Sequence, residues 1–117
     1  MQSSRQKGNV RENKVSKHLE ALGYFCYPSR GSRGIDLIAI APGTLHLPHL
    51  GIEVGGEKKS VREAFGKMRL LPQCPGMVLL VVREIKTNGR NHFRWHAAAE
   101  VRGHDSFEGA VDAARKA

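Results

Sequence analysis

Two segments decide how this chain folds, GSRGIDLIAI at residues 31–40 and GIEVGGEKK at residues 51–59. Each carries an acidic residue in an apolar run: Asp36 precedes Leu-Ile-Ala-Ile, and Glu53 lies between two β-branched residues. Short apolar runs of this kind are typical of buried strands, where a carboxylate is costly unless its charge is compensated. A divalent cation is the simplest shared compensation for two such acids, because hard cations take oxygen ligands.

Composition favours a nucleic-acid partner. The 117 residues include 19 Lys and Arg against 11 Asp and Glu, and the formal net charge is +8. This balance favours polyanions, the alternative being a ribosome-associated or merely basic protein. The two cysteines form no Cys-x-x-Cys pair, and no apolar run reaches the roughly 18 residues of a membrane helix. We therefore expect a cytoplasmic protein with no membrane segment.

The length predicts a single domain over residues 1–117, with a core over about residues 6–98 and a C-terminal helix over about 105–116. Hydrophobic periodicity supplies its elements. Helices are predicted over Gln6–Leu22, ended by Gly23, and over Lys59–Leu71. Strands are predicted over Tyr24–Tyr27, from Asp36, around Glu53, over Met77–Val82 and over His92–Ala98. The order predicts an α/β fold, a central mixed β-sheet flanked by helices.

Other charged residues are placed to join the two acids. Glu12 lies one turn before Val15 on the first helix, so it projects from the inward-facing side. The alternative is an ordinary contact with neighbouring Lys or Arg. Arg30 and Arg33 lie in the glycine-rich turn before Asp36, where arginine can bind phosphate in a bidentate way. A surface loop with two solvated arginines is the alternative for that turn.

Three short motifs occur in order over about residues 6–83: Lys7-Gly8-x-x-x-Glu12, Gly31-Ser32-x-x-x-Asp36-Leu37-Ile38-Ala39 and Ile52-Glu53-Val54. In order and spacing the chain resembles the PD-(D/E)XK nuclease superfamily, and most specifically the archaeal-type Holliday junction resolvases. The resemblance implies a restriction-endonuclease-like core. It also implies a homodimer that makes paired nicks in branched double-stranded DNA, the four-way junction, by metal-dependent hydrolysis.

The resemblance also implies residue roles. Asp36, Glu53 and the backbone carbonyl of Val54 would ligate Mg²⁺, with Mn²⁺ as a substitute. Glu12 would bind the metal or orient a water, and Ser32 would hydrogen-bond the phosphate. The residues that would contact DNA are Lys7, Arg11, Arg30, Arg33 and Arg62.

The chain departs from the family pattern two residues after Glu53. The pattern places a lysine there, and this chain has Gly55. Lys58 or Lys59 could swing over Gly55-Gly56 into the vacated space, and some superfamily members resemble this arrangement, which favours Lys59. Without a rescue the protein would be a catalytically inactive DNA-binding module of the same fold. A second departure is the absence of basic residues at Asn13 and Pro28, which leaves a related nickase or flap nuclease as another alternative.

Overall fold

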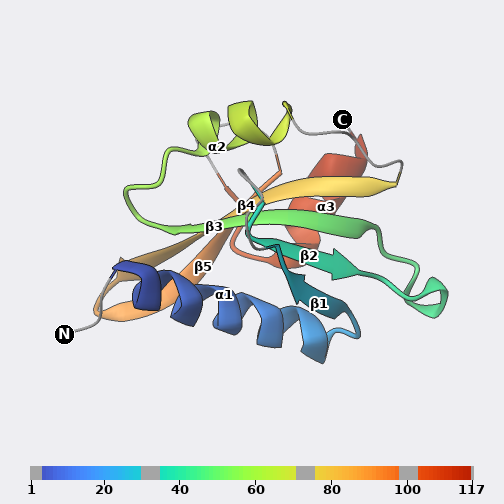
Figure 1. The fold of residues 1–117 in the computed structure, drawn as a ribbon, viewed down its shortest axis with the longest axis horizontal. Helices are drawn as coiled ribbons and strands as arrows, with labels where there is room; N and C mark the ends of the chain where they lie inside the picture. The colour runs from blue at the N-terminus through green and yellow to red at the C-terminus, as the bar shows by residue number, and fades with distance from the viewer. Residues whose placement is uncertain (1–3, 30–34, 71–75, 98–102, 117) are drawn as a thin grey trace.

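The computed structural model describes residues 4–29, 35–70, 76–97 and 103–116, with side chains from residue 10 onward. Within these ranges a five-stranded mixed sheet is flanked by helices (Figure 1), which confirms the predicted α/β fold. No helix in the described ranges is both long and apolar enough to cross a membrane. The elements are α1 (Ser4–Ala21), β1 (Phe25–Pro28), β2 (Leu37–Ile40), the short 3-10 helix η1 (Gly43–Leu45), β3 (His49–Gly56), α2 (Val61–Met68), β4 (Met77–Thr87), β5 (Arg90–His96) and α3 (Phe107–Lys116).

The sheet places the Glu53 strand at its centre. Its order is β1-β2-β3-β4-β5, and among these described strands only β3 and β4 run parallel to each other. Parallel strands need a crossover connection, and α2 provides it between β3 and β4. The ladder pairs Glu53 with Val81 on β4. Glu53 therefore lies in the interior of the sheet, between two strands.

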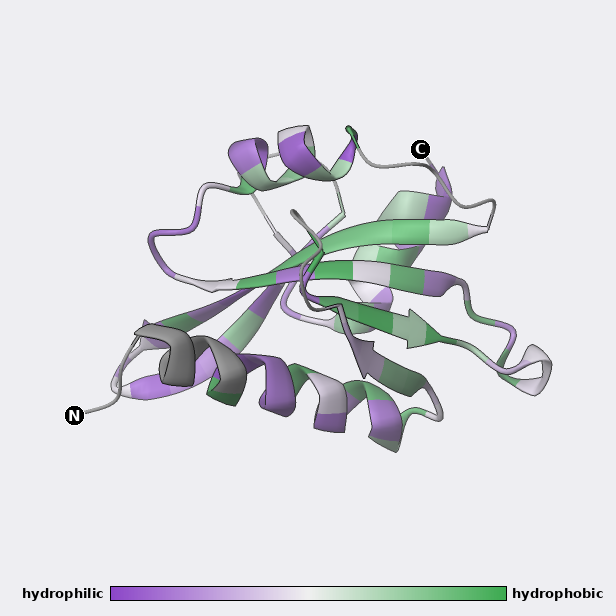
Figure 2. Ribbon diagram, in the orientation of Figure 1, coloured by the Kyte–Doolittle hydropathy of each residue, from purple (hydrophilic) through white to green (hydrophobic). Residues whose placement is uncertain are grey.

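The two faces of the sheet are covered differently. Leu50 and Ile52 belong to a core cluster with residues of α1 and α3, and Val81 belongs to a second cluster with Phe65 of α2. Figure 1 shows α1 and α2 on opposite sides of the sheet, and Figure 2 shows hydrophobic residues concentrated in the strands between them. Because successive strand residues face opposite sides, Glu53 lies on the α2 face.

A glycine cap separates the first helix from the first strand, and the strand begins one residue later than predicted. Gly23 has a φ of +108°, which a residue without Cβ adopts readily. The backbone N–H of Tyr24 donates to the Leu19 carbonyl at 3.1 Å. Tyr24 therefore still closes the helix, and β1 begins at Phe25. Pro28 is tolerated at its end because β1 is an edge strand.

The prediction that α2 begins at Lys59 was wrong. The helix begins at Val61, because the Ser60 hydroxyl caps it by accepting from the Glu63 N–H at 3.2 Å. Lys59 therefore lies in the loop before the helix, and Leu71, the predicted end of this helix, lies outside the described residues.

The fourth strand is longer than its apolar run. β4 continues past Val82 to Thr87, through charged residues, and then turns into β5. Asn88 and Gly89 form the turn with φ of +53° and +78°, and Asn-Gly is the residue pair typical of two-residue hairpin turns with positive φ at both positions. The sequence prediction ended this strand five residues too early because it followed hydrophobicity alone.

Trp95 is a core residue. From the sequence, residues 45–50 and an outer surface near Trp95 are candidates either for a dimer interface or for ordinary core. Trp95 is only 2% exposed, and its ring meets those of Phe107 and His18, with centroids 5.3 Å apart in both pairs. Leu45 and Leu50 also pack into the main cluster. The hydrophobic residues that suggested these interfaces are therefore explained by core packing.

We predict that Trp95→Ala lowers the free energy of unfolding by about 3–5 kcal/mol, the usual cost of truncating a buried aromatic side chain. Phe25→Ala is the matched control, because that ring is 59% exposed, and it should change stability by less than about 1 kcal/mol. Urea denaturation followed by circular dichroism measures both. Equal losses in the two variants would contradict the packing described here.

Candidate active site

Asp36 is fastened to the strand that carries Glu53. Its backbone N–H donates to the Ile52 carbonyl at 2.8 Å, and its carboxylate Oδ2 accepts from the Val54 N–H, also at 2.8 Å. The register Leu37↔Ile52, extended by one residue, places Asp36 opposite Glu53. The two predicted metal ligands are therefore brought together at the start of β2.

The Glu53 carboxylate is buried and only half satisfied. The residue is 6% exposed, and Oε1 accepts a short hydrogen bond from the Lys59 ammonium. Oε2 is buried with no hydrogen-bond partner among the described residues. Buried carboxylate oxygens are normally hydrogen-bonded, and an unpaired one is costly. This oxygen is therefore free to accept a cation.

The backbone offers a further oxygen at the same place. The Val54 N–H points to Asp36, and the N–H and carbonyl of one strand residue project toward the same neighbouring strand. The Val54 carbonyl therefore faces the side of β3 on which Asp36 lies. Two carboxylates and a carbonyl match the oxygen donors that Mg²⁺ and Mn²⁺ prefer. The residues present fit a hard divalent cation.

Lys59 reaches Glu53 by crossing Gly55. A Cβ atom at position 55 would lie 2.5 Å from Cδ and 2.8 Å from Cγ of Lys59, closer than real Cβ atoms approach. The absence of a side chain at position 55 thus opens the path along which the Lys59 stem runs. Lys58 is exposed to solvent, whereas Lys59 is half-buried. The structure places the Lys59 ammonium against Glu53.

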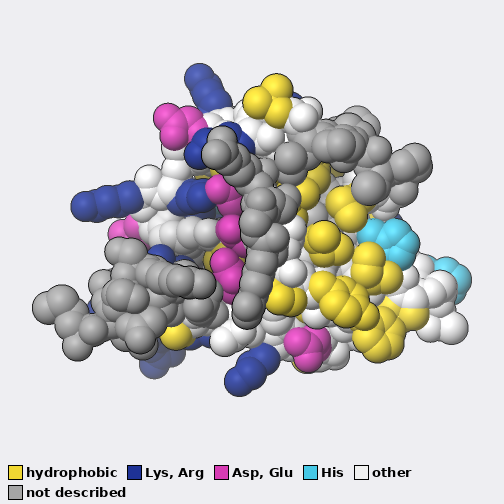
Figure 3. Space-filling view, in the orientation of Figure 1, with side chains coloured by type: hydrophobic (Ala, Val, Ile, Leu, Met, Phe, Trp, Pro, Cys, Tyr) yellow, Lys and Arg dark blue, Asp and Glu magenta, His cyan; other side chains and the backbone are white. Residues whose placement is uncertain are grey.

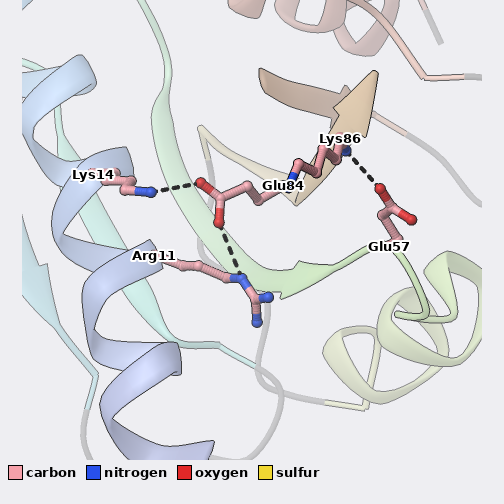
Figure 4. Close-up of polar contacts among 5 residues, drawn as sticks. All are labelled: Arg11, Lys14, Glu57, Glu84 and Lys86. Carbon is pink, nitrogen blue, oxygen red and sulfur yellow. Dashed lines mark hydrogen bonds and ion pairs between the residues drawn. The ribbon is translucent and has the colours of Figure 1, made fainter. Parts of the chain in front are cut away.

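The Arg11 guanidinium lies against Gly56 on the other face of the sheet, as the Lys59 stem lies against Gly55. A Cβ atom at Gly56 would lie 2.9 Å from Arg11 Nη2. Arg11 Nε donates to Glu84 Oε1 at 3.3 Å, and Lys14 Nζ donates to Glu84 Oε2 at 2.8 Å. Figure 4 shows both α1 side chains directed at the Glu84 carboxylate on β4. The glycine pair therefore admits one cationic side chain on each face of β3.

Acidic, basic and hydrophobic side chains occupy different areas of the surface shown in Figure 3. In the view of Figure 3, acidic side chains form a short row at the centre of the face. Most Lys and Arg side chains in this view lie to their left, and hydrophobic side chains gather to their right, over the strands of the sheet. The large exposed hydrophobic residues of these strands are Phe25, Tyr27 and Ile40. The acidic centre is thus bordered by basic groups on one side.

The other predicted site residues lie on the helices or outside the described residues. Glu12 is half-buried on α1, and no group of three or more His, Cys, Asp or Glu side chains placed to hold a metal occurs in the described ranges. Arg62 is exposed on α2. Ser32, Arg30 and Arg33 lie outside the described residues, as does the side chain of Lys7.

Sequence reasoning missed the charged end of β4. Arg83 Nη1 donates to the Glu57 carbonyl at 3.0 Å, and the Lys86 N–H donates to Glu57 Oε1 at 2.6 Å (Figure 4). Both contacts hold the loop that carries Lys59. The one signal in the sequence is that no Gly or Pro follows Val82 before the Asn88-Gly89 turn, and that the β-branched residues Ile85 and Thr87 lie in this interval.

His96 anchors Arg83 from the interior. The imidazole is fully buried, and its Nε2 accepts from Arg83 Nε at 3.0 Å. Burial is the main cause that lowers the His96 pKa to about 4, and the neighbouring Arg83 and Arg94 charges lower it further. His96 therefore stays neutral near pH 7, and its Nε2 remains an acceptor.

Comparison with solved structures identifies a similar fold. An archaeal Hjc structure, from Archaeoglobus fulgidus, aligns over 92% of this chain and 88% of its own length, with a TM-score of 0.60 and 16% sequence identity. Hjc is described as a Holliday junction resolvase from an archaeal hyperthermophile. This chain shares its fold with a resolvase. No protein-family model and no curated protein sequence matches the chain. At 16% identity the likeness shows the restriction-endonuclease-like fold alone.

We predict that His96 makes stability fall as pH is lowered from about 6.5 toward 4. The unfolded chain takes up the proton near pH 6.5 and the folded protein only near pH 4. Between these values the unfolded state binds more protons, so stability is complete above pH 6.5 and is lost below it. In urea denaturation, the free energy of unfolding of the wild type should fall by about 2 kcal/mol between pH 7 and pH 5. His96→Gln should not show this loss. His92→Gln is the matched control, because it removes a histidine from the same strand. An identical pH dependence in His96→Gln and the wild type would contradict the assignment.

Proposed function

We propose that this protein is a metal-dependent, structure-selective DNA endonuclease, a Holliday junction resolvase that makes paired nicks in four-way junctions. The observation that carries the proposal is the Glu53 carboxylate, which is buried beside Asp36, is paired with Lys59 at one oxygen and is unpartnered among the described residues at the other. This arrangement lies on a fold shared with a resolvase, in a chain of net charge +8.

Asp36, Glu53 and the Val54 carbonyl would hold the cation, Mg²⁺ or Mn²⁺. When bound, it supplies Lewis-acid polarisation of the scissile phosphate and lowers the pKa of a water ligand. The protein's own contribution is preorganisation. The Val54 N–H fixes the orientation of the Asp36 carboxylate, and burial on β3 fixes that of Glu53. Glu12, on α1, is proposed to act from outside this group, on a water or on the cation's outer shell.

Lys59 would supply the ammonium that the superfamily pattern places at position 55. Its charge lies beside the carboxylates, where it can neutralise negative charge that develops on the phosphate. Arg11 and Arg62, together with the basic turn that contains Ser32, would bind the flanking phosphates, since backbone contacts position DNA without reading its sequence. These contacts make binding salt-dependent.

A homodimer follows from the proposed reaction. Resolution of a four-way junction requires two symmetry-related cuts, and each chain carries one pair of carboxylates of this kind in its described residues. A two-fold dimer supplies two equivalent sites. Sedimentation of the protein with and without junction DNA tests this part of the proposal.

The deciding experiment uses labelled four-way junction, flap and linear duplex DNA, incubated with the purified protein in Mg²⁺, Mn²⁺ or EDTA. Paired nicks near the branch point that require metal are expected. Cleavage confined to flaps would identify a related flap nuclease. Binding without cleavage in both metals would identify an inactive DNA-binding module, the alternative that Gly55 raises.

Asp36→Asn is predicted to lower junction cleavage by about 100-fold or more, because a neutral amide is a poor cation ligand. The side-chain amide oxygen of this variant can still accept from the Val54 N–H, so the fold and junction binding should survive. Gel-shift titration and single-turnover cleavage measure the two quantities separately. Cleavage at the wild-type rate would remove Asp36 from the site.

Lys59→Met is predicted to lower the cleavage rate by about 100-fold, since it keeps an apolar stem over Gly55 and removes only the ammonium. Lys58→Met is the matched comparison, because Lys58 is the exposed neighbour, and its effect should be far smaller. Single-turnover rates at saturating protein separate the two. A larger loss in Lys58→Met would assign the displaced role to that residue.

A further inference from the structure

The loop between β3 and α2 determines where the Lys59 ammonium lies. This loop leaves the sheet after Gly56 and returns the Lys59 side chain across Gly55 toward Glu53. It is closed by one backbone hydrogen bond, from the Lys59 N–H to the Gly56 carbonyl at 3.1 Å. A lysine two residues after Glu53 on the strand itself would be fixed by the sheet. A lysine in a loop needs another restraint.

Glu57, the first residue after β3, supplies a restraint at two atoms. Its carbonyl accepts from Arg83 Nη1 at 3.0 Å, and its carboxylate Oε1 accepts from the Lys86 N–H at 2.6 Å. Both donors belong to β4, the strand paired with β3, and Figure 4 shows the Glu57 carboxylate directed at the Lys86 backbone. Glu57 is thereby tied to the sheet two residues before Lys59.

The donors are themselves fixed. The Arg83 Nε donates to the buried His96 ring at 3.0 Å, so the guanidinium is held between β5 and the loop. The Lys86 N–H belongs to the backbone of the β4–β5 hairpin. Neither donor depends on a flexible side chain whose far end is unsupported. The rate of a reaction depends strongly on the positions of the groups that take part in it. A displacement of about 1 Å can lower the rate by about 100-fold.

We propose that Glu57 is a positioning residue for the reaction: through its contacts to Arg83 and Lys86 it holds the loop so that the Lys59 ammonium stays beside Glu53. The inference rests on the proposed function. Where such a lysine lies on the strand itself, strand pairing fixes its position. Here an exposed loop glutamate, which touches neither substrate nor cation, would fix the position of the lysine.

The test compares Glu57→Ala, Glu57→Gln and a control, Glu108→Ala, which removes an exposed carboxylate from α3. Glu57→Ala should lower kcat for junction cleavage by about 10- to 100-fold while KM and the junction Kd stay within about twofold. Glu57→Gln should recover most of the rate, because its amide oxygen can still accept from the Lys86 N–H. Glu108→Ala should match the wild type.

Amide hydrogen exchange provides a readout that does not depend on activity. In Glu57→Ala the amides of Lys86 and Lys59 should exchange at least about tenfold faster, and Glu57→Gln should restore their protection. Wild-type cleavage in Glu57→Ala, or unchanged exchange at Lys59, would overturn the inference. If the wild type cuts no junction in Mg²⁺ or Mn²⁺, the proposed function fails, and exchange at Lys59 still decides whether Glu57 fixes the loop.

Discussion

The burial of one carboxylate organises this protein. Glu53 lies on the central strand with 6% of its surface exposed, so its charge loses most of its hydration. A neighbouring cationic side chain compensates one oxygen, and the other is unpartnered among the described residues. A buried ion pair contributes little net stability by itself, because desolvation offsets the attraction. The ion pair is therefore weak evidence of a stabilising role, and under the proposed function the unpartnered oxygen would serve as a cation ligand.

The glycine pair is the structural condition for that site. Side chains at positions 55 and 56 would point to opposite faces of β3, and each would collide with a cationic side chain, Lys59 on one face and Arg11 on the other. A lysine at position 55 and the observed path of Lys59 cannot coexist, since they would fill the same space. The absence of a side chain at position 55 and the position of the Lys59 ammonium beside Glu53 are therefore structurally linked.

Much of the fold could be predicted because it depends on local patterns. The periodicity of Val15 and Leu19, the Gly23 cap and the Asn-Gly hairpin each specify an element within a few residues. The start of α2 could not be placed by hydrophobicity. It depends on the Ser60 cap, and that two-residue difference decides whether Lys59 lies on a helix or in a loop. Asp36 and Glu53 lie opposite each other because Asp36 directly precedes β2 and Glu53 lies on β3, the strand paired with it.

The support of the site could not be predicted, because it comes from residues far apart in the chain. Glu57 contacts Arg83 and Lys86, 26 and 29 positions later, and Arg11 contacts Glu84, 73 positions later. All three partners follow the apolar run of β4, where charge would ordinarily indicate the end of a strand. The strand continues because the Arg83 guanidinium and the Lys86 backbone N–H bind the loop after β3, and the Glu84 carboxylate binds α1. Since β4 lies next to β3 throughout, the strand that neighbours Glu53 also binds Arg11 through Glu84 and the loop that carries Lys59 through Glu57.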